Sequence, residues 1–183
     1  LEKSITARVK SKVPWSISRI ISEYPRQRGR GHNAWKNKSM LKIRKMEEAD
    51  LEEVAAIEQE NFSRPWTEEG FRKAVMDTHT LYLSAFLDEI LVGYIGMWIA
   101  LDEGEITNVS VKKEYQGQKI GAHLLEKLLE EGDKIGVSSY FLEVRESNQA
   151  AIALYEKTGF EKAGIRKNFY EDPVENGIVM CKR

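Results

Sequence analysis

Several features that would assign this chain to a special class of protein are missing from its sequence. Cys181 is the only cysteine, which excludes an internal disulfide framework and a multi-thiolate metal site. The longest apolar run, Ile90 to Leu101, has 12 residues and is too short to span a membrane. The three histidines show no metal-ligand spacing. We therefore expect a cytoplasmic protein with no metal and no membrane partner.

Charge is distributed unevenly, although the chain as a whole is nearly neutral. Its 183 residues carry 28 Lys and Arg against 29 Asp and Glu, a net charge of −1. Residues 1–39 hold ten basic and two acidic residues, which gives +8 and leaves −9 for residues 40–183. We interpret the chain as a basic N-terminal extension, 1–39, followed by one domain, 40–183, since that length supports a core of its own.

The extension, residues 1–39, is open to several interpretations. Apolar residues between Val13 and Tyr24 recur at helical spacing, and Pro25 would end such a helix. A basic amphipathic helix followed by an Arg/Gly-rich stretch is typical of a targeting peptide, a binder of anionic surfaces or an RNA-contacting arm. The alternative is that the extension is not native and that Met40 is the true first residue.

Residues 40–183 alternate between patterns typical of strands and of helices. The nearly continuous apolar segment 90–101 indicates a central strand that is covered on both faces. A strand–helix–strand order from 105 to 144 predicts two parallel neighbouring strands. The fold class is therefore mixed α/β on one central sheet. The predicted strands are 41–45, 81–87, 90–101, 105–111, 139–144, 160–165 and 177–181, and the predicted helices are 50–61, 67–77, 120 to about 132, and 148–158.

Short polar residues mark the expected element boundaries. Asp50, followed by Glu53, predicts a capping box, and Thr67 predicts the N-cap of the second helix. Asn148 is either a helix N-cap or a ligand-binding amide. A loop that passes through Tyr170 is expected to join the last two strands.

A glycine-containing loop leads directly into the third helix. Its sequence at 116–122 is Q-G-Q-K-I-G-A. A helix N-terminus offers unpaired N–H groups and a partial positive charge, and small residues let a phosphate approach the backbone, so this turn can cradle a pyrophosphate. It matches neither the Walker A pattern nor the dinucleotide pattern G-x-G-x-x-G. An ordinary helix start remains the alternative.

A second informative segment runs from Leu142 to Tyr155. Glu143 lies in a predicted buried strand, where it either faces a polar rim or serves a reaction. Tyr155 lies in the following helix, where it is either a packing residue or a proton donor. Neither residue is decisive when it is considered alone.

Taken together, these segments resemble the GNAT acetyltransferases and, within them, the bacterial ribosomal-protein-alanine N-acetyltransferases. The resemblance rests on Q-G-Q-K-I-G-A after a strand, followed by L-E-V-R-x-S-N-x-x-A-I-x-L-Y-x-K-x-G-F. Supporting segments are N-F-S-R-P-W at 61–66, N-V-S-V at 108–111 and R-K-N-F-Y at 166–170. It spans residues 40–183 and leaves the extension outside.

The resemblance implies the acyl-CoA N-acyltransferase fold, in which the parallel strands 105–111 and 139–144 splay apart around acetyl-CoA. The fold would carry flanking helices on a central mixed sheet. The cofactor-binding residues implied are the backbones of Val109, Ser110 and Val111, the loop residues Gln116, Gly117, Gln118, Lys119, Ile120, Gly121 and Ala122, and the side chain of Asn148.

The resemblance also implies roles in catalysis. Glu143 matches the family's general base and Tyr155 its general acid. Trp66 and Tyr170 either line the peptide groove from opposite sides or simply pack in the core. Glu105 either orients the incoming amine or sits at a strand end in solvent. The implied acceptor is a protein N-terminal amine, in particular the alanine of a small-subunit ribosomal protein. A small amine, a lysine side chain, and a non-catalytic acyl-CoA-binding module are the alternatives. The chemistry requires neither nucleic acid nor membrane.

Two residues depart from the family pattern. Lys119 stands at the first glycine of the usual Q-x-x-G-x-G loop, and a left-handed backbone there would cost about 1 kcal/mol or more. We expect a right-handed backbone instead, so that Lys119 adds only a favourable charge near a phosphate. Phe169 replaces a tyrosine that is common in the family, which removes one potential hydrogen bond to the substrate.

Overall fold

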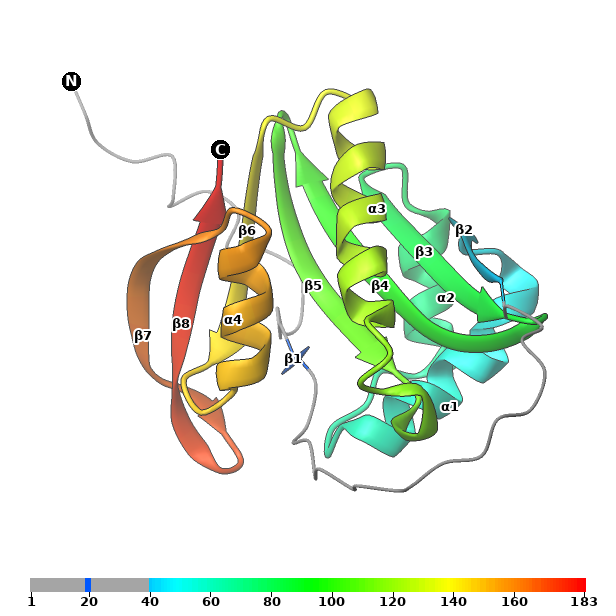
Figure 1. Ribbon diagram of the computed structural model, residues 1–183, viewed down its shortest axis with the longest axis horizontal. Coiled ribbons are helices and arrows are strands. Elements are labelled where there is room, and N and C mark those ends of the chain that lie inside the picture. The colour runs from blue at the N-terminus through cyan, green and yellow to red at the C-terminus, as the bar shows by residue number, and fades with distance from the viewer. Residues whose placement is uncertain (1–18, 21–39) are drawn as a thin grey trace, which may run out of the picture.

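The structure, a computed structural model, describes residues 19–20 and 40–183. One sheet runs in the order β2-β3-β4-β5-β6-β8-β7, and the short strand β1 pairs with β5 (Figure 1). The predicted α/β class with a central mixed sheet is confirmed. The strands are β1 Arg19–Ile20, β2 Leu41–Lys45, β3 Thr80–Leu87, β4 Ile90–Ala100, β5 Glu103–Val111, β6 Ser139–Arg145, β7 Glu161–Glu171 and β8 Val174–Lys182.

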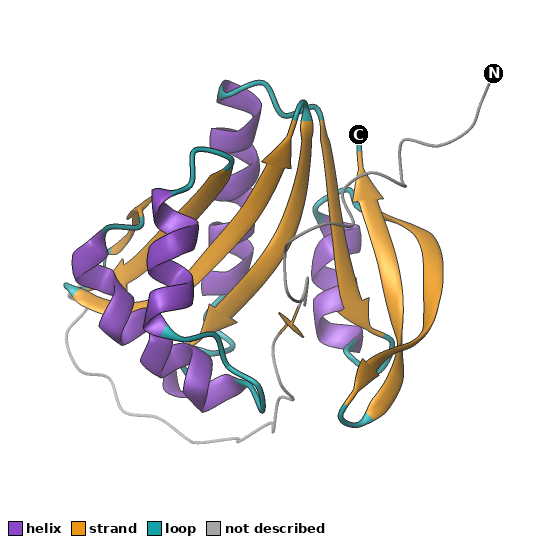
Figure 2. Cartoon of the chain, turned by 180° about the vertical axis from the view of Figure 1, so that it is seen from behind, coloured by secondary structure: helices purple, strands orange, loops and turns teal. Residues whose placement is uncertain are grey.

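Helices cover both faces of this sheet. The helices α3, Ile120–Lys134, and α4, Gln149–Lys157, lie on the face that is toward the viewer in Figure 1. The helices α1, Leu51–Asn61, and α2, Glu68–Met76, lie on the other face, which Figure 2 shows in front. The sheet is therefore the middle layer of three.

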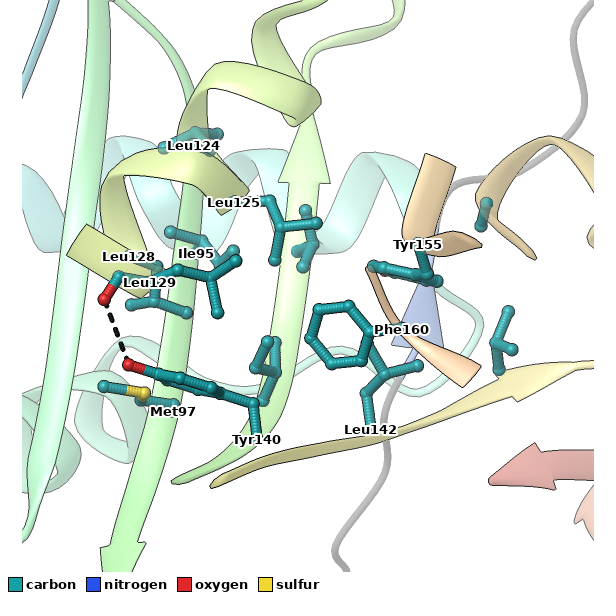
Figure 3. Close-up of a cluster of buried hydrophobic side chains, with 14 of the residues drawn as sticks. Ile95, Met97, Leu124, Leu125, Leu128, Leu129, Tyr140, Leu142, Tyr155 and Phe160 are labelled. Atoms are coloured by element: carbon teal, nitrogen blue, oxygen red, sulfur yellow. Dashed lines mark hydrogen bonds between the residues drawn. The ribbon is translucent and has the colours of Figure 1, made fainter. Parts of the chain in front are cut away.

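Two apolar clusters form the core, one on each face of the sheet. On the α3 and α4 side, leucines of α3 pack over β4, β5 and β6, and the Tyr140 hydroxyl donates to the Leu129 carbonyl at 3.0 Å (Figure 3). On the other side, the ring of Phe71 meets that of Tyr94 edge-on with centroids 5.2 Å apart. The helices bury their apolar stripes in these clusters, and that burial is the main stabilising term.

The parallel strands β5 and β6 pair only over a short stretch and then diverge. Their register runs from Glu103 opposite Ser139 to Glu105 opposite Phe141. Just beyond this point β5 is bulged, because Gly96 of β4 faces Asn108 and Met97 faces Ile106. A bulge bends a strand and ends regular pairing. The splayed parallel pair is thus present, and its gap is visible in Figure 1.

Tyr82 of β3 supports the bulge from the side of α1 and α2. Its ring packs on Gly96, where a Cβ atom would lie 2.1 Å from the ring. Its hydroxyl contacts Thr107 Oγ1 and Asn108 Oδ1, each at 3.2 Å. The bulge is therefore built into the packing of three strands.

Strand β1 lies in the gap between β5 and β6 (Figure 1). It runs parallel to β5, with Arg19 opposite Asn108 and Ile20 opposite Val109. The helix predicted over residues 13–24 is thus wrong at Arg19–Ile20, because the edge of β5 that β6 leaves unpaired offers backbone partners to an extended segment. The rest of that predicted helix lies outside the described residues. The division of the chain at residue 40 stays a prediction.

Of the helix caps that the sequence indicates, two are confirmed and one is wrong. Thr67 Oγ1 accepts the Gly70 N–H at 3.1 Å, and Asn148 Oδ1 accepts the Ala151 N–H at 3.1 Å, so both are confirmed as N-caps. The capping box of Asp50 with Glu53 is wrong. The Asp50 carboxylate instead accepts the Glu47 N–H at 2.9 Å and closes the short 3₁₀ turn Glu48–Asp50 that precedes α1.

The last two strands are longer than the sequence pattern predicts. Tyr170 lies within β7 and pairs with Glu175 of β8, so the loop predicted through Tyr170 is wrong. A bulge between Arg166 and Tyr170 obscures the alternation of side chains there. The result is a long β7–β8 hairpin beside the splayed pair.

Candidate active site

The loop before α3 has the shape of an anion cradle. The helix begins at Ile120, Lys119 is its N-cap with φ 65° and ψ 12°, and Gly117 has φ 78°. The expectation of a right-handed Lys119 is therefore wrong. The chain reverses direction at this point to enter the helix, and a lysine holds the left-handed conformation at a cost of about 1 kcal/mol.

A cavity of about 190 Å³ lies between this loop, the end of β5 and helix α4. The lining includes seven residues of the predicted cofactor set: Val111, Gln116, Gly117, Lys119, Ile120, Gly121 and Ala122. It also includes Tyr115, Ala150, Ala151 and Leu154, which sequence reasoning did not assign. The adjacent alanines were a usable signal, since small side chains on a helix leave room for a ligand. Val109, Ser110, Gln118 and Asn148 do not line the cavity.

The end of β5 is tied to both α1 and the loop. The Val111 carbonyl accepts from Asn61 Nδ2 and from Gln116 Nε2, each at 3.0 Å. Asn61 Nδ2 also donates to Ser110 Oγ at 2.7 Å. These contacts engage both lone pairs of the Val111 carbonyl and hold the cofactor side of β5 in place.

Glu143 lies where β5 and β6 diverge, two residues beyond the last paired residue, Phe141. Its neighbours Leu142 and Val144 are buried under α4, so by strand alternation Glu143 faces the opposite side of the sheet. The side chain is 9% exposed and ion-paired with Arg166 of β7. Sequence reasoning included Arg166 in a motif and gave it no role.

The Arg166 guanidinium is itself held by an aromatic ring. It lies 4.0 Å from the centroid of Phe169, and the Phe169 ring packs against Gly177 of β8. A guanidinium over an aromatic face is attracted by the ring quadrupole. Phe169 therefore orients the partner of Glu143.

Tyr155 enters the site from α4, on the other face of the sheet. It is 1% exposed, and its ring meets Phe160 edge-on at 5.7 Å (Figure 3). Its hydroxyl has no hydrogen-bond partner in the described part of the chain. Burial raises the pKa of Tyr155 well above its usual value, and the nearby Tyr170 raises it further. The phenol is thus a protonated donor with an unmet hydrogen bond.

The predicted substrate residues lie on three different elements: Trp66 and Tyr170 pack against other side chains, and only Glu105 is placed at the splayed pair. The Trp66 ring lies 5.4 Å from that of Phe71, and its backbone N–H donates to Glu58 Oε1 at 3.2 Å. Tyr170 is 4% exposed, with the Arg145 guanidinium 4.2 Å above its ring. Glu105 is exposed at the last paired position of β5.

Comparison with known proteins decides the family. Residues 50–160 match the model of the acetyltransferase (GNAT) family. The chain belongs to the GNAT family of acetyltransferases. This GNAT enzyme is 37% identical over 144 residues to a putative ribosomal protein bS18-alanine N-acetyltransferase of Bacillus subtilis, which covers 78% of the chain and 95% of the relative.

Two further relatives agree. The ribosomal protein bS18-alanine N-acetyltransferase of Escherichia coli K12 is 39% identical over 146 residues, covering 78% of this chain and 97% of that protein. The crystal structure of the ribosomal-protein-S18-alanine N-acetyltransferase from Escherichia coli superposes with a TM-score of 0.73 at 37% identity, over 78% of this chain and 93% of that one. The GNAT fold predicted from the motifs is confirmed.

GNAT enzymes use acetyl-CoA, and the site of this member fits that group. The cavity at the α3 N-terminus suits a pyrophosphate, because N–H groups and the helix dipole favour an anion there. The unpartnered Tyr155 hydroxyl, one helical turn beyond the cavity residue Ala151, is a donor that a sulfur atom can accept from.

Among residues 19–20 and 40–183, no group of three or more His, Cys, Asp and Glu side chains is placed to hold a metal ion. In the same part of the chain, no helix is long and apolar enough to cross a membrane.

Proposed function

We propose that this GNAT enzyme acetylates the N-terminal α-amine of a protein, in particular the alanine of ribosomal protein bS18. The identity of 37–39% to enzymes named for that reaction supports the acceptor. The proposal places the reaction in the cytoplasm and in residues 40–183. One observation carries the chemistry: Glu143 lies on β6 just past its last pairing with β5, and α4 on the other face of the sheet carries the buried Tyr155 hydroxyl, which has no hydrogen-bond partner among the described residues.

Glu143 would act on the amine. An α-amine has a reference pKa near 8, so roughly a tenth of it is already neutral at pH 7, against well under a thousandth of a lysine amine. A carboxylate can therefore take the remaining proton through a water without a large change of its own pKa. Glu105, exposed on the same sheet at the last paired residue, would orient the incoming ammonium.

Tyr155 would act on the leaving group. Acetyl-CoA, when bound, would supply an acetyl group on a thioester, and coenzyme A would leave as a thiolate when the amine nitrogen takes that acetyl group. A thiol has a pKa of about 8.5, below that of a phenol, so Tyr155 stabilises negative charge by donating a hydrogen bond and need not lose its proton. The raised pKa of the buried Tyr155 keeps that donor protonated.

The remaining residues of the site would bind the cofactor or the acceptor without taking part in the reaction. The cavity residues Gln116, Gly117, Lys119 and Gly121 would hold the pyrophosphate, and Asn148 would contact the cofactor arm. Between them, the backbones of Val109, Ser110 and Val111 would pair with that arm as an added strand does, and the arm would displace β1, which pairs with Val109 in this structure. Trp66 and Tyr170 would border the acceptor groove.

Two elements on either side of the site support a peptide acceptor. The α1–α2 loop, residues 62–67, and the β7–β8 hairpin are joined by Arg64 and Glu171, whose charged atoms are 2.9 Å apart. A chain end that enters between these elements meets Glu143 at the mouth of the splayed pair.

An acetylation assay on matched peptides tests this function. The peptides differ only at residue one, and a further peptide has a blocked N-terminus and one lysine. We expect acetyl transfer to the alanine peptide and none to the blocked peptide. Activity on the blocked peptide alone would replace the N-terminal amine by a lysine side chain. Acetyl-CoA binding without transfer to any amine would indicate a non-catalytic binding module.

A further inference from the structure

A buried carboxylate outside the reacting groups holds the loop at the acceptor side. Glu58 of α1 is 1% exposed. Its Oε1 accepts the backbone N–H of Trp66 at 3.2 Å, and its Oε2 accepts the hydroxyl of Tyr94. A buried carboxylate is costly unless its oxygens are hydrogen-bonded, and these two donors help to stabilise it here.

The two donors come from very different parts of the fold. Tyr94 lies on β4 and is fully buried, with its ring against Phe71. Trp66 lies in the α1–α2 loop, one residue before the N-cap of α2. The carboxylate therefore connects the backbone of the loop to β4 through the buried hydroxyl of Tyr94.

The other end of the same loop is fixed independently. Asn61, the last residue of α1, donates to Ser110 Oγ and to the Val111 carbonyl on β5. Only residues 62–65 lie between the two anchors, and Arg64 from this stretch reaches across to Glu171 of the hairpin. The loop is thus anchored at both of its ends and tied to the hairpin in the middle.

We propose that Glu58 is a positioning residue for the acceptor, which fixes the α1–α2 loop so that the groove exists before the peptide binds. This inference rests on the proposed function. Glu58 touches none of the proposed reacting groups in the contacts above. It acts through the Trp66 N–H, and a preformed loop saves the ordering cost that binding would otherwise include.

Loss of the Glu58 contact should change KM for the peptide but neither kcat nor KM for acetyl-CoA. Losing one charge-assisted hydrogen bond to the loop is expected to raise KM for the peptide by about 10-fold. We expect kcat and KM for acetyl-CoA to change by less than about 2-fold, because Glu143, Tyr155 and the cavity stay in place. A residue that only stabilised the fold would not produce this split.

Three variants test the role. Glu58→Met keeps the volume and leaves both donors without an acceptor. Glu58→Gln restores function, since its amide oxygen accepts from Trp66 and its amide nitrogen donates to the Tyr94 oxygen. Tyr94→Phe is the matched control, because it removes a hydrogen bond to the same carboxylate and keeps the one to the loop. If Glu58→Met does not fold, Glu58→Asp replaces it, with a carboxylate too short to reach both donors.

The readouts are steady-state kinetics with an alanine-starting peptide and amide hydrogen exchange at Trp66. For Glu58→Met we expect the higher peptide KM together with Trp66 exchange at least about 10-fold faster, while amides of β4 keep their protection. Glu58→Gln and Tyr94→Phe should stay within about 2-fold of the parent in both readouts.

Other outcomes contradict the inference. Unchanged exchange at Trp66 in Glu58→Met shows that Glu58 does not hold the loop, and faster exchange with an unchanged peptide KM shows that the loop does not serve the acceptor. A parent enzyme that acetylates no peptide refutes the proposed function instead. In that case the exchange at Trp66 still decides whether Glu58 fixes the loop.

Discussion

The guanidinium of Arg166 is ion-paired with the carboxylate of Glu143, the proposed general base. The two residues lie on β7 and β6, which are separated by β8, so the pair spans three strands of the sheet. Arg166 is half exposed and stacked on Phe169. The arrangement holds one carboxylate oxygen in a defined position at the mouth of the splayed pair.

Replacing Glu143 by Gln tests the base while keeping this arrangement. The amide oxygen still accepts from Arg166 but cannot take a proton from the amine. We expect kcat/KM for the alanine peptide to fall by about 10²- to 10⁴-fold, the range of general acid–base catalysis. Calorimetry should show unchanged affinity for acetyl-CoA. Turnover within 2-fold of the parent would remove Glu143 from the mechanism.

Replacing Tyr155 by Phe tests the acid. Its hydroxyl is buried and has no partner among the described residues, so its removal costs no hydrogen bond in the ligand-free fold. We expect kcat to fall by at least about 10-fold, with unchanged affinity for acetyl-CoA and an equal or higher melting temperature. Parallel loss of melting temperature and turnover would instead mean that Tyr155 only packs against Phe160.

Much of the fold was predictable because long, regular patterns dominate it. The apolar run of β4 and the leucine stripe of α3 each indicate a buried element, and both are buried in the structure. The cofactor loop was predictable from motif order, and most of the predicted loop residues line one cavity. These features depend on residues that are close together in the sequence.

The features that the sequence did not predict depend on contacts between distant segments. Asp50 caps a 3₁₀ turn because Arg44 and Ser84 bond the same carboxylate. Tyr170 belongs to a strand because β8 pairs with it across a bulge. Local propensity carries no information about such partners. Lys119 is a different case, a left-handed N-cap of α3 in a conformation that its residue type disfavours.

Two substitutions of Lys119 separate its charge from its backbone strain. Lys119→Ala and Lys119→Gly both remove a positive charge from the cavity wall, so both should raise KM for acetyl-CoA by about 3- to 10-fold. Only glycine also relieves the left-handed strain, so we expect Lys119→Gly to be more stable than Lys119→Ala by about 1 kcal/mol in urea unfolding. A higher KM in only one of the two variants would show that loop shape, not charge, governs cofactor affinity.

Asp50 predicts a pH dependence of stability. The residue is 5% exposed, and burial pushes its pKa upward. The hydrogen bonds from Arg44, from the Glu47 N–H and from Ser84 outweigh burial and leave the pKa of Asp50 below its usual value. The lowered pKa contributes stability that is complete above the unfolded-state pKa of about 4 and is lost as the pH falls through the folded-state value.

The difference in free energy of unfolding between the parent and Asp50→Asn should therefore change with pH in a defined direction. At pH 7 we expect the variant to be less stable by about 1–3 kcal/mol, because Arg44 loses a buried anionic partner that it holds through two nitrogens, each at 2.8 Å. The difference in free energy of unfolding should shrink as the pH is lowered from 5 toward 3, since the parent alone loses the ionised carboxylate. Urea unfolding at pH 7, 5, 4 and 3.5 measures this difference in free energy. Ser84→Ala is the control, because it removes one hydrogen bond to Asp50 and keeps the charge pair with Arg44. A difference that stays constant with pH would mean that packing around residue 50, and not the charge of Asp50, stabilises the start of α1.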